Sequence, residues 1–177
     1  GNDTMVFNSS TTGVTFTFSA GTVIVTDGLG NTVTHTGGNV ENFTGTSVDD
    51  EFVFNNGATV TGVIDGNGGH DHVDLSATTT ARHVGLTALG TVDGFQGTLN
   101  GTGGFNNIDA FTGSSASTDS ITGMNATAEF VLDGSPQYVS TNTLDFTSFE
   151  ALIGGTAADT FTLTAPFSGS ISGGLGT

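Results

Sequence analysis

Apolar residues alternate with polar ones over short stretches of the chain, a pattern typical of half-buried β-strands. The clearest alternations predict strands over residues 14–18, 22–26, 32–36, 52–54 and 161–163. Turn dipeptides of the Asp-Gly or Asn-Gly type interrupt the chain at residues 27–28, 56–57, 65–66, 93–94 and 133–134. We find no convincing helical period. The fold class predicted from the pattern is therefore all-β, with many short strands.

Internal repeats favour one architecture among the all-β folds. Residues 41–54 and 150–163 carry an acid, an apolar residue, Gly, Asp and Phe at the same offsets. A looser copy spans residues 109–121, with one extra residue before its Asp. Such self-similarity is typical of repeats that stack on one another. The chain is predicted to be a parallel β-solenoid (β-helix) of about eight coils, at about 22 residues per coil.

The predicted solenoid forms one unit over residues 1–177, built from three degenerate sub-repeats at roughly 1–68, 69–123 and 124–177. Equivalent repeat positions should occupy equivalent places in the coils. We therefore expect two sets of side chains to point into one shared bore. The first set is Phe43, Phe111 and Leu152, and the second is Phe52, Ile121 and Phe161.

The two ends of the sequence complete one another. Residues 171–177, continued into residues 1–7, parallel the internal stretch 64–76. This parallel indicates one period of a longer tandem array, with an arbitrary chain boundary as the alternative. The expected partners are neighbouring copies placed end to end along a fibre axis. Thr4–Phe7 would pair in parallel with Phe161–Leu163 or Ile171 of the preceding copy, at a rise of about 35–45 Å per copy.

Composition and charge exclude several classes of protein. The chain holds 29 Gly, 33 Thr and 15 Ser, and 17 acids stand against a single base, Arg82. A net charge of −16 would repel nucleic acid, so no nucleic-acid partner is expected. No apolar run approaches the roughly 20 residues of a membrane span, so no membrane insertion is expected. Without cysteine there is neither a disulfide nor a thiolate metal site.

Residues 68–75, and residues 173–177 continued into 1–7, resemble the repeats-in-toxin nonapeptide GGxGxDxUx. Residues 41–54 and 150–163 also resemble repeats of giant secreted bacterial adhesins and surface proteins. The resemblance implies a β-solenoid or β-roll fold and a location outside the cell or on its surface. In the toxin family, Ca²⁺ lies between successive turns, and calcium is the cofactor that the resemblance suggests.

Aspartates in the Gly-rich turns are the candidate metal ligands. If these turns stack, the carboxylates of Asp3, Asp50, Asp71 and Asp159 approach one another, and Ca²⁺ prefers such oxygen ligands. The alternative is that each Asp bonds to its own backbone as a turn cap, with no ion. His70 and His72 share one face of a strand and suggest a transition-metal site, with exposed turn residues as the alternative.

The function expected from these observations is structural: a segment of an extracellular fibre, stalk or adhesin made of tandem β-solenoid repeats. Surface glycans or other cells are further candidate partners. The first alternative is a calcium-dependent adhesive or binding module. The second is a polysaccharide-processing β-helix, for which Asp49, Asp50 and Glu51 offer carboxylates. A single arginine offers little positive charge for binding an acidic substrate, and no nucleophile motif occurs. We therefore expect no enzyme and no catalytic residues.

Overall fold

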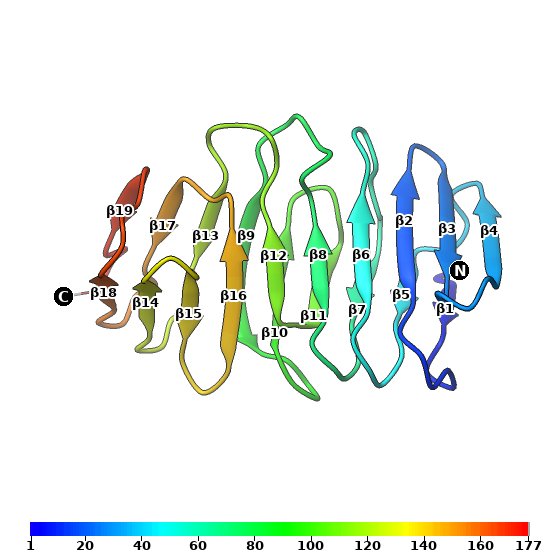
Figure 1. Cartoon of the computed structure of the whole chain (residues 1–177), viewed down its shortest axis with the longest axis horizontal. Coiled ribbons are helices and arrows are strands. Elements are labelled where there is room, and N and C mark those ends of the chain that lie inside the picture. The colour runs from blue at the N-terminus through cyan, green and yellow to red at the C-terminus, as the bar shows by residue number, and fades with distance from the viewer. Residues whose placement is uncertain (177) are drawn as a thin grey trace.

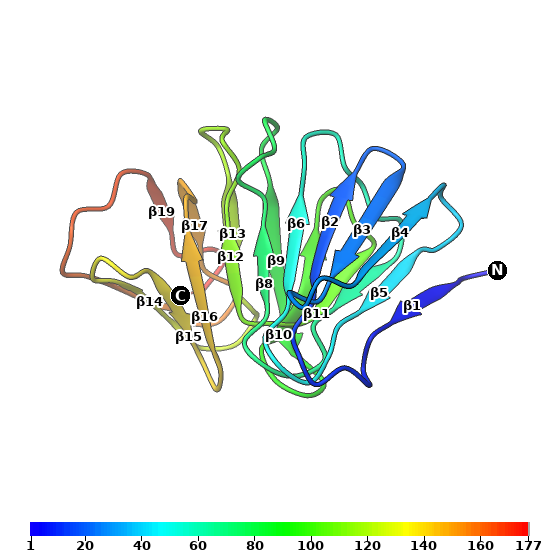
Figure 2. The same cartoon turned by 45° about the vertical axis from the view of Figure 1, so that its right-hand side comes forward.

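The computed structural model describes residues 1–176, and these residues form strands and turns without any helix. Nineteen strands assemble into two sheets that face one another across a shared core (Figures 1 and 2). The strands run across the long axis of the molecule, so both sheets extend along that axis. The prediction of an all-β chain is confirmed.

The two sheets have nine and ten strands. In spatial order, the nine-stranded sheet contains β1 (Thr4–Val6), β5 (Asn42–Thr44), β7 (Val63–Asp65), β11 (Gly104–Ile108), β10 (Phe95–Leu99), β9 (His83–Leu89), β13 (Ser120–Thr122), β17 (Ala151–Ile153) and β19 (Ser170–Ser172). The ten-stranded sheet contains β18 (Thr160–Leu163), β14 (Glu129–Leu132), β15 (Gln137–Val139), β16 (Thr143–Thr147), β12 (Ala110–Thr112), β8 (His72–Asp74), β6 (Glu51–Phe54), β2 (Thr15–Ser19), β3 (Thr22–Thr26) and β4 (Thr32–Thr36).

The chain alternates between the two sheets. We call each stay in one sheet a pass; a pass is either a single strand or an antiparallel meander of three strands. The meanders are β2–β3–β4, β9–β10–β11 and β14–β15–β16, and the chain makes thirteen passes in all. Consecutive passes in one sheet pair in parallel, whereas the six antiparallel pairings all lie inside the meanders. The sheets are therefore mixed, with mostly parallel strands.

The meanders are what the sequence analysis did not foresee. Two successive passes take 21 residues between Phe43 and Ile64, close to the expected coil length. Thirteen passes correspond to six and a half two-pass turns, fewer than the about eight coils expected, because each meander uses 19 to 26 residues in one pass. The predicted strands over residues 14–18, 22–26, 32–36, 52–54 and 161–163 are all present, within one or two residues at their ends.

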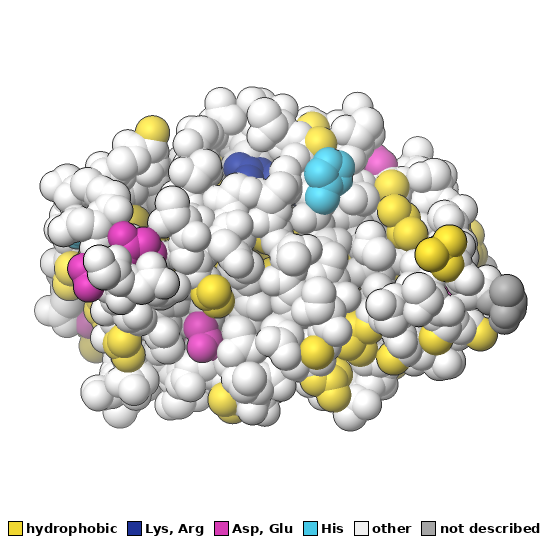
Figure 3. Space-filling view, turned by 180° about the vertical axis from the view of Figure 1, so that it is seen from behind, with side chains coloured by type: hydrophobic (Ala, Val, Ile, Leu, Met, Phe, Trp, Pro, Cys, Tyr) yellow, Lys and Arg dark blue, Asp and Glu magenta, His cyan; other side chains and the backbone are white. Residues whose placement is uncertain are grey.

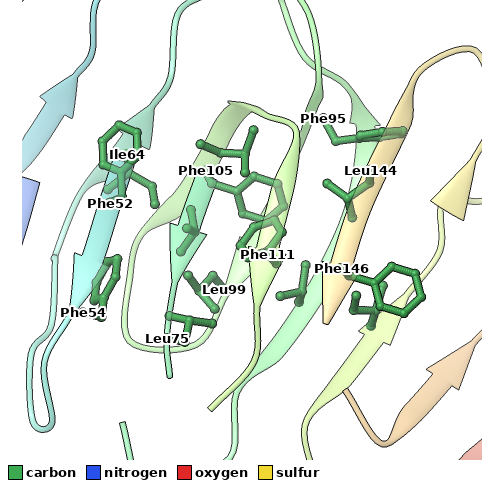
Figure 4. Close-up of a cluster of buried hydrophobic side chains, with 14 of the residues drawn as sticks. Phe52, Phe54, Ile64, Leu75, Phe95, Leu99, Phe105, Phe111, Leu144 and Phe146 are labelled. Carbon is green, nitrogen blue, oxygen red and sulfur yellow. The ribbon is translucent and has the colours of Figure 1, made fainter. Parts of the chain in front are cut away.

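Apolar side chains fill the space between the sheets in one continuous cluster (Figure 4). Parallel in-register pairing places like residues side by side, so the rings of Phe16 and Phe52 stack at 4.8 Å with an interplanar angle of 2°. Phe130 and Phe161 repeat this geometry at 4.8 Å and 3°. Offset or stacked rings add packing energy to their burial. The ladder of phenylalanines thus holds successive strands in register.

All six side chains predicted to share a bore belong to this core. Five are buried, and Phe161 is half-buried and packs against the same cluster. Their distribution between the sheets differs from the expectation: Phe43 and Leu152 lie in the nine-stranded sheet, whereas Phe111 lies in the ten-stranded sheet. The reason is that an odd number of passes separates the looser copy from each of the other two. Equivalent positions therefore face the same core from opposite sheets.

Truncating one ring of this ladder should destabilise the fold strongly. Phe52 is fully buried between the sheets, so Phe52→Ala leaves a cavity and should lower the free energy of unfolding by about 3–5 kcal/mol. The exposed residue Leu29 is the control, and Leu29→Ala should change it by less than about 0.5 kcal/mol. Urea unfolding followed by circular dichroism measures both. Equal effects of the two substitutions would contradict the assigned core.

Candidate functional site

The spacing of Gly and Asp that recurs in the repeats builds one kind of turn. In each such turn the Asp carboxylate accepts two backbone hydrogen bonds, one from its own turn and one from the residue just before the neighbouring strand. Asp50 accepts from the N–H groups of Thr46 and Val14. Asp119 accepts from Ser114 and Arg82, and Asp159 from Gly155 and Ala128. A carboxylate with such charge-assisted bonds satisfies buried donors of two successive strands at once.

The glycine of the repeat makes room for this carboxylate. A Cβ atom placed on Gly45 would lie 2.2 Å from Asp50 Oδ2, and one on Gly154 would lie 2.6 Å from Asp159 Oδ2. Both distances are far below van der Waals contact. Any side chain at these positions would displace the carboxylate from the backbone N–H groups. The Gly and the Asp of the repeat are therefore one structural unit.

The structure does not gather the four predicted calcium ligands. Asp50 and Asp159 each accept backbone hydrogen bonds from their own turn and from the residue just before the neighbouring strand, and Asp3 is exposed ahead of β1. Asp50 and Asp71 are adjacent, because the Asp50 N–H donates to Asp71 Oδ1 at 2.8 Å. Among the described residues, Asp71 alone of the four belongs to a group of three carboxylates close enough to share an ion.

Asp71 departs from the capping pattern. Its Oδ1 accepts the expected bond from the N–H of Asp50, the residue just before the neighbouring strand β6. Its Oδ2, however, is buried without a hydrogen-bond partner. The position equivalent to Thr46 is Asn67, which adopts a left-handed conformation with φ of 73°. In this conformation the Asn67 N–H donates to Asp65 Oδ1 at 3.0 Å instead. One carboxylate oxygen of Asp71 is consequently left over.

Asp93 and Asp109 lie close to the carboxylate of Asp71. One carboxylate oxygen from each of Asp71, Asp93 and Asp109 lies within 4.8 Å of the other two. Asp109 Oδ2 accepts a bond from the Asp71 N–H, and Asp93 Oδ2 accepts one from the Gly69 N–H. Sequence analysis missed both residues. Asp93 belongs to a predicted Asp-Gly turn and Asp109 opens the looser repeat, but only the tertiary fold brings them to Asp71.

Burial dominates the electrostatics of this group. Desolvation, with the charges of Asp50, Asp109 and Asp93, raises the pKa of Asp71 from 3.8 to about 8. Burial likewise raises the pKa of Asp50 and that of Asp109, and their neighbouring carboxylates act in the same direction. His70 opposes the rise at Asp109. Mutual repulsion of this kind is relieved by a proton or by a cation.

The histidine pair does not converge on one point. His70 Nε2 lies 3.2 Å from Asp145 Oδ2, whereas His72 Nε2 lies 2.9 Å from Thr112 Oγ1. The only arginine is equally committed to the fold. Arg82 is buried, and its guanidinium donates to the Asn100 carbonyl and to Thr78 Oγ1. It is therefore not presented to an acidic substrate.

A surface hollow of about 700 Å³ lies beside β9, β14 and β15. Its lining includes Thr87, Leu89, Met124 and Ser140, and one acid, Glu129. That carboxylate already accepts a hydrogen bond from Thr162 Oγ1. Glycoside hydrolysis usually needs two carboxylates across a cleft. The hollow thus offers half of that arrangement.

Removing a capping carboxylate should cost more than removing an exposed one. Asp119→Ala leaves the N–H groups of Arg82 and Ser114 without their acceptor, so we expect a loss of about 3 kcal/mol or more of unfolding free energy. Asp133 is the matched control, because it is exposed and accepts only from the Ser135 N–H. Asp133→Ala should cost about 1 kcal/mol or less. Chemical denaturation of both variants tests the difference, and similar losses would argue against the cap.

Stability should depend on pH through Asp71. Because its folded pKa is raised above the ordinary 3.8 to about 8, the folded chain binds a proton that the unfolded chain releases. The resulting stabilisation is full below about pH 4 and is lost as the pH rises to about 8. Urea unfolding in chelator-containing buffers should therefore show stability falling over this window. Asp71→Asn should flatten the fall and Asp133→Asn should not; an unchanged slope in Asp71→Asn would refute the assignment.

The sheet ends form the last candidate site. One end of the molecule carries β1 and β4, and the other carries β18 and β19, each the outermost strand of its sheet (Figures 1 and 2). The described residues contain no helix long and apolar enough to span a membrane. Comparison with protein-family models, curated proteins and solved structures finds no match. The geometry of the turns and of the sheet ends therefore carries the functional argument.

Proposed function

We propose that the chain is a structural segment of an extracellular fibre, stalk or adhesin, a β-solenoid whose copies stack end to end. The observation that carries this proposal is at the sheet ends. All four outermost strands have an open edge where their internal equivalents pair with a further strand. An unpaired strand edge is a template for another chain. A second copy of this chain supplies strands of the matching kind.

Internal pairings indicate what should cover β1 and β4. β1 pairs in parallel with β5, with Met5 opposite Phe43. The equivalent internal pair is β8 with β12, where Val73 lies opposite Phe111. β8 has a second parallel neighbour, β6, and β1 has none. β4 is the last strand of its meander, like β11, which pairs in parallel with β7. The missing neighbours of β1 and β4 should therefore resemble β6 and β7.

The opposite end of the molecule offers such strands. β18 carries Phe161 where β6 carries Phe52, and each pairs in parallel with the first strand of a meander. β19 follows β17 as β7 follows β5. We therefore place β1 of one copy on β18 of the preceding copy, with Met5 opposite Phe161. β4 then lies on β19, with His35 opposite Ile171.

This stacking exchanges the two sheets. β1 belongs to the nine-stranded sheet but would extend the ten-stranded sheet of its neighbour, and β4 would do the reverse. The exchange follows from the odd number of passes, since the fourteenth pass would fall in the ten-stranded sheet. Successive copies are then related by half a turn about the long axis. At about 4.8 Å per strand, each copy adds about 45 Å to the filament.

Apolar side chains at the ends favour such covering. Val33, Leu163 and Ile171 face the core side of their strands, yet they are 45%, 51% and 39% exposed. Their internal partners Val25, Leu132 and Leu152 are buried. Burying apolar area contributes about 25 cal/mol per Å², in addition to the backbone hydrogen bonds of the new strand pairs. The ends of the molecule thus expose apolar side chains whose internal partners are buried in the core.

The rest of the surface suits an extended extracellular structure. The face in Figure 3 consists mostly of backbone and of side chains that are neither hydrophobic nor charged, among scattered hydrophobic groups and a few acids. A negatively charged chain with polar sides resists lateral association, while its ends still bind the ends of other copies. Hydroxyl-rich sides also leave surface glycans or other cells as candidate adhesive partners.

An inward-pointing charge at a sheet end should abolish stacking. Ile171→Lys places an ammonium at the proposed contact with β4, and such charges are how natural edges avoid pairing. The matched control is Ile24→Lys, because Ile24 is also 39% exposed but lies on the outer face of β3. Wild-type chain and Ile24→Lys should associate with rising concentration in sedimentation experiments. Ile171→Lys should remain a monomer with an unchanged circular-dichroism spectrum.

Electron microscopy of concentrated wild-type chain should show filaments with a rise of about 45 Å and a half-turn between copies. A head-to-tail fusion of two copies should melt above the single copy, and Ile171→Lys in its first copy should remove the gain. A wild-type chain that stays monomeric, with a fusion no more stable than one copy, would overturn the proposal. So would equal association of the two lysine variants.

A further inference from the structure

We propose that Asp71, Asp93 and Asp109 bind one Ca²⁺ ion, which ties the β9–β10 turn to the turn before β8. The three donors come from separate segments of the chain: the turn between β7 and β8, the tip of the β9–β10 hairpin, and the connection from β11 to β12. The site therefore differs from a stack of consecutive Gly-Asp turns. It also does not depend on the stacking of copies.

The spacing of the carboxylates fits calcium. Oxygens bound to Ca²⁺ lie at about 2.3–2.6 Å from the ion, so two on opposite sides are about 4.6–5.2 Å apart. The three carboxylate oxygens lie within 4.8 Å of one another. The three oxygens are therefore close enough to share one Ca²⁺ ion. A set of ligands supplied by the protein alone suits Ca²⁺ better than Mg²⁺, which usually keeps several of its waters.

Two orphaned oxygens indicate that a ligand is missing at this point. Asp71 is fully buried, and its Oδ2 has no hydrogen-bond partner. Asp93 Oδ1 is also buried and without a partner. Leaving buried acceptors unsatisfied is costly, and most native structures avoid it. At the equivalent caps, Asp50 and Asp119, backbone N–H groups use both oxygens of each carboxylate.

A fourth oxygen lies beside the leftover oxygen of Asp71. A Cβ atom on Gly66 would be 2.2 Å from Asp71 Oδ2 and 2.2 Å from the Asn107 carbonyl oxygen. The absence of a side chain at Gly66 lets these two acceptors approach each other. Backbone carbonyls commonly complete calcium sites built on carboxylates. Two acceptors brought together with no donor between them favour a cation.

Calcium binding can be measured directly on the whole chain. In chelator-treated buffer, titration calorimetry with CaCl₂ should show one strong site, and millimolar Ca²⁺ should raise the melting temperature because it binds only the folded state. Asp93→Asn removes one of the three charges but keeps an oxygen acceptor for the Gly69 N–H. Its affinity for Ca²⁺ should fall about tenfold or more. The Ile171→Lys background allows the titration without stacking.

Asp133→Asn is the matched control, because Asp133 also precedes a glycine and also accepts a backbone N–H in its turn. It should bind Ca²⁺ like the wild type. The proposal is overturned if the wild-type chain shows no calcium-dependent shift, if Asp93→Asn and Asp133→Asn bind equally well, or if Zn²⁺ binds in place of Ca²⁺. Should Asp93→Asn fail to fold, a crystal structure of wild-type chain with Ca²⁺ decides, and an ion bound away from these carboxylates refutes the site.

Discussion

The fold depends on a carboxylate that accepts backbone N–H groups from two successive strands. At Asp50, Asp119 and Asp159 this interaction closes one turn and fixes the strand beside it. It also explains how 17 acids fold with one base. Four aspartates are buried, and at two of them, Asp50 and Asp119, backbone N–H groups bind both oxygens of the carboxylate. Some of the acidic side chains thus belong to the interior of the fold, and fewer of them lie on the surface than the net charge suggests.

The same interaction sets the axial order of the core. Because each carboxylate joins a turn to the residue before the neighbouring strand, the strands that follow begin at the same level and pair in register. In-register parallel pairing then stacks Phe on Phe, as at Phe16 and Phe52. The polar caps and the aromatic ladder therefore enforce one another. A shift in register would leave buried N–H groups without acceptors and would at the same time separate the stacked rings.

The sequence predicted the parts of this fold that are local or repeated. Alternation located the strands, and the Gly–Asp spacing located the caps, because both reflect contacts that recur at fixed offsets. The meanders escaped prediction, since residues 15–19 and 22–26 alternate in the same way whether their partners are parallel or antiparallel. The transfer of Phe111 to the opposite sheet depends on counting passes, which local patterns do not reveal. Asp93 and Asp109 reach Asp71 only through tertiary structure, and no spacing in the sequence announces it.

The odd number of passes has a mechanical consequence in the proposed filament. One sheet has ten strands and the other nine, so copies stacked without exchange would add about 4.8 Å more to one side at every step. Such a filament would curve steadily toward its shorter sheet. When each copy is rotated by half a turn, a ten-stranded sheet continues into a nine-stranded one, and the two sides gain equal length over two copies. The three meanders interrupt the repeat, but with this half-turn they leave the proposed fibre straight.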